Sequence, residues 1–193
     1  VEIINTKGEE FSLFDEQFLN DVANMKEKNL AIEMLKKLLA QHIKKHQKKN
    51  LTQAELFSEM LDKRLAEYLR GMISNEEVIK ELLEMAKLMK QHAEEGNALG
   101  LSDEEQAFYD ALTRPRAVKD FYENNQLVAM AREITDALRK NRTLDWRQKE
   151  TARAKMRTMI KRLLKKYHYP PEEAQNAIEV VMRQCELWAD NEE

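Results

Sequence analysis

The stretch RKNRTLDWRQKETARAKMRTMIKRLLKKYHYPP, residues Arg139–Pro171, decides how the rest of this chain can be organised. It contains twelve Lys or Arg residues and two acids, Asp145 and Glu150, so its net charge is +10. The whole chain has a net charge of −3, so the remaining residues carry −13. Two acids cannot neutralise twelve bases through pairs along one helix, so this separation of charge is the main indication of function in the sequence.

The same stretch has the periodicity of an amphipathic helix, which we predict to run from an N-cap at Asp145 to about Tyr167. On a helical wheel, one side is apolar and carries Trp146, Met156, Ile160, Leu163, Leu164 and Tyr167. The opposite side is cationic and carries Arg147, Lys155, Arg162, Lys165 and Lys166, with Lys161 beside them. Pro170 and Pro171 stop this helix and begin the next one.

The cationic face has three interpretations: a track for the phosphate backbone of DNA, a docking face for an acidic protein, or an ordinary solvated face. Phosphate contacts would release counterions, so binding would weaken steeply with salt. The predicted DNA-binding residues are Arg147, Lys155, Lys161, Arg162, Lys165 and Lys166, extended by Lys44, Lys45 and Lys48 from an earlier basic segment. Lys149 and Arg153 fall on the apolar side, where Arg153 is expected to extend its stem or to pair with a carboxylate.

The composition outside this stretch predicts an all-α protein. Charged residues make up 35% of the chain and aromatic residues 7%, with only four Gly and three Pro among 193 residues. We predict an irregular bundle of about seven or eight helices. Three capping boxes predict helix starts, at Thr52–Glu55, Ser74–Glu77 and Ser102–Glu105.

Glycines place the predicted domain boundary. Gly71 and Gly96 are predicted to end helices, and residues 97–101 form a Gly-containing linker. The predicted division is therefore an N-terminal helical part, 1–96, the linker, 97–101, and a C-terminal helical part, 102–193, although both parts could pack as one domain.

No pattern in the chain indicates catalysis, since it lacks a Walker-type glycine loop, a G-x-S-x-G elbow and a GxGxxG motif. His42 and His46 could share a metal, but the lysines between them favour a solvated face. Cys185 is expected in the core. One cysteine, no secretory signal and no apolar run of about 20 residues favour a cytoplasmic protein without a membrane partner. The start at Val1 suggests a piece of a longer protein.

Several stretches resemble the C-terminal region of the restriction, or motor, subunit of type I restriction–modification enzymes. The most specific are LSDEEQAFYDAL at residues 101–112 and the Asp145–Arg147 and Tyr169–Pro171 ends of the basic stretch. EFSLF at residues 10–14 also agrees. The resemblance spans essentially the whole chain.

This resemblance implies a parent subunit that acts as an ATP-dependent site-specific deoxyribonuclease, with a nuclease, two motor lobes, ATP and Mg²⁺. The helical C-terminal region would attach the motor to the methyltransferase core of methylation and specificity subunits. No catalytic residue of the family maps onto this chain, so we expect it to have no enzymatic activity and no cofactor of its own. A pure protein-interaction module without DNA contact is the alternative.

Overall fold

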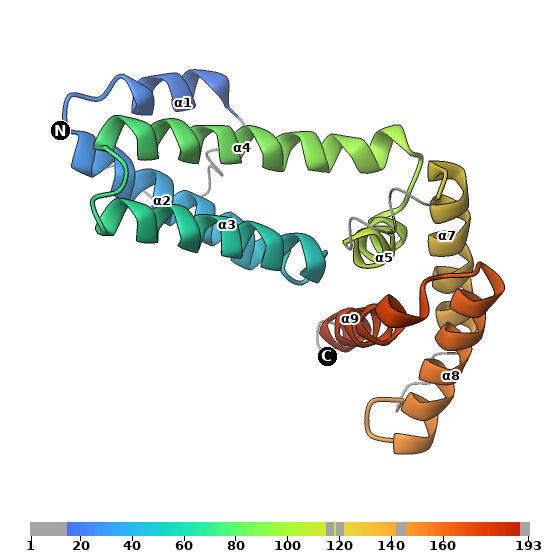
Figure 1. Ribbon diagram of the computed structural model, residues 1–193. Helices are drawn as coiled ribbons and strands as arrows, with labels where there is room; N and C mark the ends of the chain where they lie inside the picture. The colour runs from blue at the N-terminus through green and yellow to red at the C-terminus, as the bar shows by residue number, and fades with distance from the viewer. Residues whose placement is uncertain (1–14, 115–117, 119–121, 142–145, 190–193) are drawn as a thin grey trace. The chain divides into compact units, whose positions relative to one another are not determined.

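The computed structural model describes residues 15–114, 118, 122–141 and 146–189, and across these ranges the chain is helical, with no strand. Its helices are α1 (Glu16–Ala23), α2 (Lys28–His46), α3 (Leu51–Leu69), α4 (Asn75–Ala98), α5 (Asp103–Thr113), α7 (Asn124–Asn141), α8 (Glu150–Lys166) and α9 (Pro171–Ala189) (Figure 1). The predicted all-α bundle of seven or eight helices is confirmed. Within these ranges, no helix has the length and apolar character needed to cross a membrane.

The chain divides into two compact units whose boundary cuts through three helices. The first unit comprises residues up to His42 and Ser58–His92, and the second comprises Ile43–Phe57 and the residues from Ala93 onward. The division predicted from the glycines, 1–96 and 102–193, stays a prediction. Its linker is shorter than expected, because α4 continues through residue 96 and ends at Ala98.

The first unit contains α1 and most of α2, α3 and α4. Asp15 caps α1, since its carboxylate accepts the backbone N–H of Gln17 at 2.9 Å. Ser74 and Glu77 form the predicted capping box of α4, with hydrogen bonds of 3.2 and 2.7 Å. Gly71 ends α3 with a φ of 71°, in the left-handed region that favours glycine. The start of α4 predicted from its capping box and the end of α3 predicted from Gly71 are therefore confirmed.

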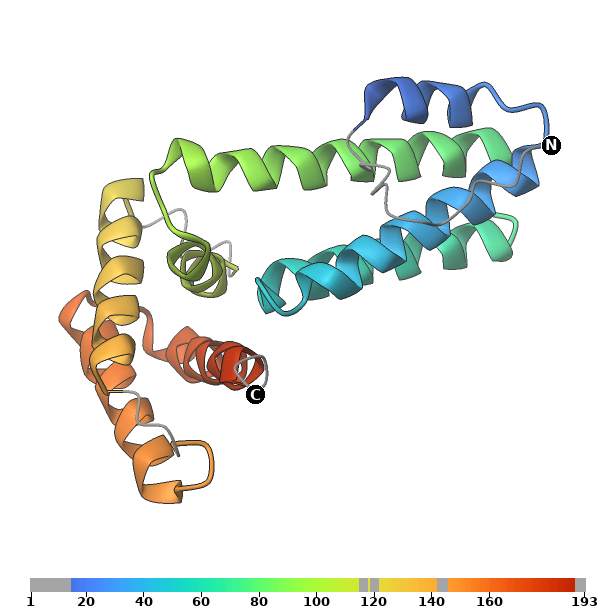
Figure 2. The same ribbon diagram turned by 180° about the vertical axis from the view of Figure 1, so that it is seen from behind.

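The second unit contains α5, α7, α8 and α9 around one hydrophobic core. Helix α7 packs against α5 and α8, and α9 packs against the same two helices (Figure 2). Phe108, Leu127, Ile134, Ile160 and Val181 are among the side chains buried there. The predicted capping box at residues 102–105 is present. Cys185 is buried in this core, as expected.

The predicted capping box at Thr52–Glu55 is wrong. Helix α3 begins two residues earlier than that box predicts, at Leu51, and the side chain of Asn50 accepts the backbone N–H of Gln53 at 3.1 Å. Glu55 instead accepts hydrogen bonds from two arginines of the second unit, on different segments: Arg114 at 3.0 Å and Arg183 at 2.6 Å. Tertiary ion pairs have therefore recruited the carboxylate that the local pattern assigned to the cap.

The start predicted for the basic helix is also wrong. Helix α8 begins at Glu150, with Lys149 at the N-cap position and no side-chain hydrogen bond to the first turn. Asp145, the predicted cap, lies outside the described residues. Trp146 and Arg147 therefore precede the helix, and only the cations from Lys155 onward in the predicted stripe are helical.

Candidate functional site

Helix α8 is held in the second unit by the apolar face that its periodicity predicts. Met156, Ile160 and Leu164 are buried, and so is Trp146 ahead of the helix. Their spacing places them on one side of the helix, where α7 and α9 pack. The predicted packing face is confirmed for these four residues, while Leu163 and Tyr167, also predicted on it, are half-buried.

Acids on other helices neutralise part of the basic stretch. Arg153 pairs with Glu186 of α9 at 2.7 Å, which is one of the two alternatives expected for it. Arg157 lies 3.6 Å from Glu179 of α9. Arg139 at the end of α7 pairs in the same way with an acid of α5. The positive charges of these arginines are therefore neutralised by acids on other helices, because α8 itself has too few acids.

Lys166 belongs to this paired group as well. Its ammonium group lies 2.7 Å from a carboxylate oxygen of Glu133 on α7, and the hydroxyl of Tyr167 donates to the other oxygen at 2.5 Å. The hydrogen bond from Lys166, followed by that from Tyr167, holds the pKa of Glu133 below its usual value. The same carboxylate raises the pKa of Tyr167 to about 12, with burial adding to the shift. Lys166 thus fixes α8 against α7.

The cations that remain define an outward face of α8. On α8, the exposed cations that form no ion pair with any described residue are Lys155, Lys161, Arg162 and Lys165. Lys161 and Lys165 stand four residues apart, a spacing at which like charges on a helix repel. Arg147 is half-buried and precedes the helix. Of the six cations predicted on this stripe, these four are therefore the outward set.

The earlier basic segment lies on another element of the same unit. Lys44 and Lys45 occupy the last turn of α2 and Lys48 follows it, all with exposed side chains. The carbonyl of Lys48 accepts a hydrogen bond of 3.2 Å from Gln184 of α9. This segment is therefore anchored to α9. DNA contact by any of the nine predicted residues stays a prediction.

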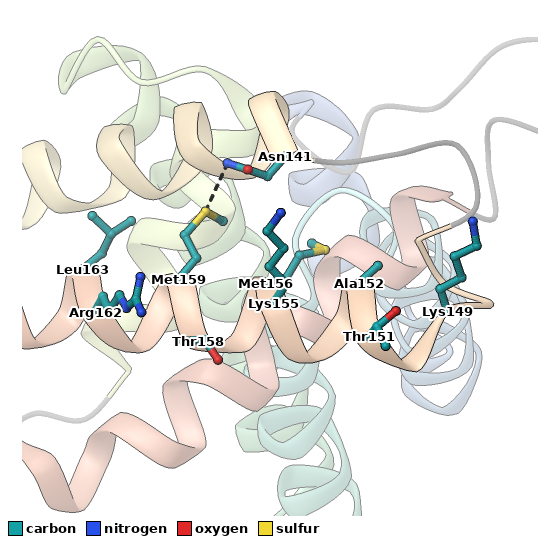
Figure 3. Close-up of a pocket in the computed structure, with 10 residues that line it drawn as sticks. All are labelled: Asn141, Lys149, Thr151, Ala152, Lys155, Met156, Thr158, Met159, Arg162 and Leu163. Carbon is teal, nitrogen blue, oxygen red and sulfur yellow. Dashed lines mark hydrogen bonds between the residues drawn. The ribbon is translucent and has the colours of Figure 1, made fainter.

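Beside the outward cations runs an open groove of about 860 Å³, here called the α8 groove (Figure 3). It is lined by Asn141, Lys149, Thr151, Ala152, Lys155, Met156, Thr158, Met159, Arg162 and Leu163. All but Asn141 and Lys149 come from α8, and Asn141 closes the groove from the end of α7. The groove therefore combines an apolar surface with a cationic border.

Sequence reasoning missed this groove. The wheel divided α8 into a packing face and a cationic face, and it assigned neither Ala152 nor Met159 to a third strip. Both side chains are only half-buried. Their spacing, with Met156 and Leu163, was the available signal, but whether neighbouring helices cover that strip depends on the tertiary packing.

Among the histidines, His46 has a side-chain partner in the parts of the chain described. His46 Nε2 lies 2.9 Å from Oε1 of Gln53, which places His46 in the hydrogen bonding of the turn between α2 and α3. No group of three or more His, Cys, Asp or Glu side chains in these ranges could hold a metal ion.

Comparisons with known proteins agree on one family. Residues 1–191 match the family described as type I restriction enzyme HindI endonuclease subunit-like, C-terminal. The HindI endonuclease subunit of Haemophilus influenzae is 36% identical over 182 residues, covering 94% of this chain and 17% of that protein. A Methanocaldococcus jannaschii protein provisionally named type I restriction enzyme MjaIXP endonuclease subunit is 30% identical over 166 residues, covering 86% and 16%. The chain thus spans about a sixth of these relatives. No solved structure matches it.

Proposed function

Because this chain belongs to the family of C-terminal regions of HindI-like type I restriction enzyme endonuclease subunits, we propose that it is an assembly domain. It docks a DNA-translocating endonuclease subunit on the methyltransferase core formed by methylation and specificity subunits. The nuclease, and the ATP and Mg²⁺ that its motor uses, are expected outside these 193 residues.

The observation that carries this proposal is the outward face of α8. Lys155 and Arg162, which border the α8 groove, have no acid partner among the described residues, although acids of α7 and α9 neutralise other cations of the same helix. A partner that supplies anionic groups opposite these two cations gains complementary contacts. An apolar strip lies directly beside the cations, as in protein interfaces that combine an apolar centre with a charged border.

The test is assembly in solution. Purified methylation and specificity subunits are mixed with the 193-residue chain, and the complex is followed by analytical ultracentrifugation. We expect co-sedimentation that weakens when Lys155 and Arg162 are both changed to Gln. Sedimentation of the wild-type chain alone, at every ratio of the components, would rule out the docking function.

A second role, contact with duplex DNA, is favoured by the same uncompensated cations. Lys161 and Lys165 lie outside the lining of the α8 groove, where they can reach phosphates without displacing a protein partner. Such contacts carry no sequence information, which suits a device that moves along any DNA.

The DNA role predicts a defined salt dependence. Binding of a duplex by the chain should be measurable at about 50 mM salt, and each phosphate contact should add about 0.9 to the slope of log K against log salt. Changing Lys161 and Lys165 to Ala should therefore reduce that slope by about 1.8. An unchanged slope in an electrophoretic mobility assay would refute contact through these two residues.

A further inference from the structure

The lining of the α8 groove repeats like a coiled-coil seam. Ala152, Met156, Met159 and Leu163 are separated by four, three and four residues. This is the spacing at which side chains line up along one side of a helix and receive the side chains of a second helix. The strip extends over eleven residue steps, so it is about 17 Å long, or about three turns.

A second row with the same spacing borders this seam and gives it a charge. Thr151, Lys155, Thr158 and Arg162 are again separated by four, three and four residues, and all four side chains are exposed. Lys155 and Arg162 therefore stand one heptad apart on one flank, the position from which charged residues select the partner helix in coiled coils. A partner helix seated on the seam would therefore meet Lys155 with one heptad and Arg162 with the next.

Two of the uncharged polar side chains along the groove, Thr158 and Asn141, already have partners. The hydroxyl of Thr158 donates to the carbonyl of Ala154 at 2.9 Å. The amide of Asn141 donates to the carbonyl of Ala137 at 2.7 Å and lies 3.3 Å from the sulfur of Met159. What the groove still lacks is therefore apolar contact for its seam and anions for its flank.

These two requirements favour one class of occupant over nucleic acid. A phosphate backbone would satisfy Lys155 and Arg162, but it has no apolar surface to cover Met159 and Leu163. An amphipathic helix with an acidic flank satisfies both, and the flexible thioether of the half-buried Met159 can adapt to its side chains. Helix-in-groove binding of this kind uses anchors at i, i+3, i+4 and i+7.

We infer that the α8 groove binds an acidic amphipathic helix of a partner subunit, with the helix seated on the seam and its acids facing Lys155 and Arg162. The inference rests on the proposed assembly function and names the surface and the chemistry through which assembly occurs.

Two charge-matched variants of the chain test it against the purified methylation and specificity subunits. Lys155→Glu/Arg162→Glu reverses the flank of the groove, and Lys161→Glu/Lys165→Glu changes the charge of the same helix by the same amount outside the groove. We expect the first to weaken core binding at least about tenfold, because like charges now face the partner's acids. We expect the second to change it less than about threefold. Equal losses of core binding for both variants would refute docking of the partner in the α8 groove.

A third variant separates protein binding from DNA binding. Met159→Lys places a charge on the seam while making α8 more cationic. It should weaken binding of the core at least about tenfold, since a desolvated ammonium group has no partner there, and it should leave or raise affinity for a DNA duplex. Core binding that is unchanged or stronger in Met159→Lys would refute the seam. Circular dichroism spectra and melting curves of all variants must match the wild type.

A synthetic probe keeps failure of the inference distinct from failure of the proposed function. Two three-heptad peptides with identical leucine seams carry Glu or Lys on the flanks. The chain should bind only the Glu peptide, and Lys155→Glu/Arg162→Glu should reverse this preference. If the chain binds the Glu peptide but not the core, the groove chemistry is supported and the methyltransferase core is refuted as its partner. Core binding without discrimination between peptides would retain the docking function and refute the groove chemistry.

Discussion

Replacing Gln184 with Met should destabilise the second unit markedly, although the two side chains are similar in length. Gln184 is only 1% exposed, and its side chain connects α9 to the turn before α3. Its Oε1 accepts the backbone N–H of Leu51 at 2.6 Å, and its Nε2 donates to the carbonyl of Lys48 at 3.2 Å. Leu51 is the first residue of α3, so no helical carbonyl can accept its N–H.

The magnitude follows from what Met leaves behind. The N–H of Leu51, in a residue that is 1% exposed, loses its acceptor, and an unsatisfied buried backbone group costs about 1–3 kcal/mol. Loss of the second hydrogen bond, to Lys48, adds about 1 kcal/mol. We therefore expect the free energy of unfolding to fall by about 2–4 kcal/mol. With a urea dependence of about 2 kcal/mol/M, the midpoint should fall by about 1–2 M.

Tryptophan fluorescence in a urea titration measures this directly, because both tryptophans, Trp146 and Trp188, belong to the second unit. Gln175→Met is the matched control. It lies on the same helix, is exposed and bonds only Glu179 at 3.3 Å, so its effect should stay within about 0.5 kcal/mol. A midpoint shift for Gln184→Met below about 0.3 M, or equal to the control, would refute the reasoning.

Three further outcomes follow from other contacts. Asn50→Ala should lower the free energy of unfolding by about 1–2 kcal/mol, and Ser74→Ala should lower it by about 1 kcal/mol. The effect is larger at Asn50 because it is a buried N-cap that also bonds an acid of α5. Urea unfolding followed by circular dichroism compares the two variants. Gly71→Ala should cost about 1–2 kcal/mol from its φ of 71° alone, since a Cβ there meets no atom within 4 Å; thermal melting measures this, and no change would contradict it. Glu133→Gln should lower the pKa of Tyr167 from about 12 toward its ordinary value, as seen in the tyrosinate absorbance. In the wild type, the stability that Tyr167 contributes is present below the ordinary tyrosine pKa and is lost as pH rises through about 12; Glu133→Gln should remove it.

Helix starts that depend on neighbouring residues could be predicted from the sequence, and one that depends on tertiary contacts could not. The boxes at Ser74 and Ser102 close within four residues, so their pattern predicts them reliably. The box at Thr52 had the same pattern. It failed because Glu55 meets Arg114 and Arg183, which lie 59 and 128 residues further along the chain. A local pattern holds no information about such partners.

The charge on α8 shows the same limit. Counting bases and acids within the basic stretch predicted a helix whose positive charge its own residues cannot neutralise. The four outward cations of α8 agree with that prediction. The count could not tell which cations would be neutralised from outside, because Glu133, Glu179 and Glu186 come close only after α7 and α9 have packed. It also could not reveal the groove, which exists because those two helices leave one strip of α8 uncovered.

The ion pairs that remove cations from the candidate site also prepare it. Arg153 and Arg157 hold α8 to α9, while Lys166 holds it to α7, so pairs with both neighbouring helices fix the rotation of α8 about its own axis. A helix fixed in this way presents its seam and outward cations in one orientation before a partner arrives. Less conformational entropy is then lost on binding, so a groove of modest length can contribute usefully to assembly. The basic stretch therefore has two roles that its composition alone does not separate: some cations orient the helix, and Lys155 and Arg162 are left to select what it binds.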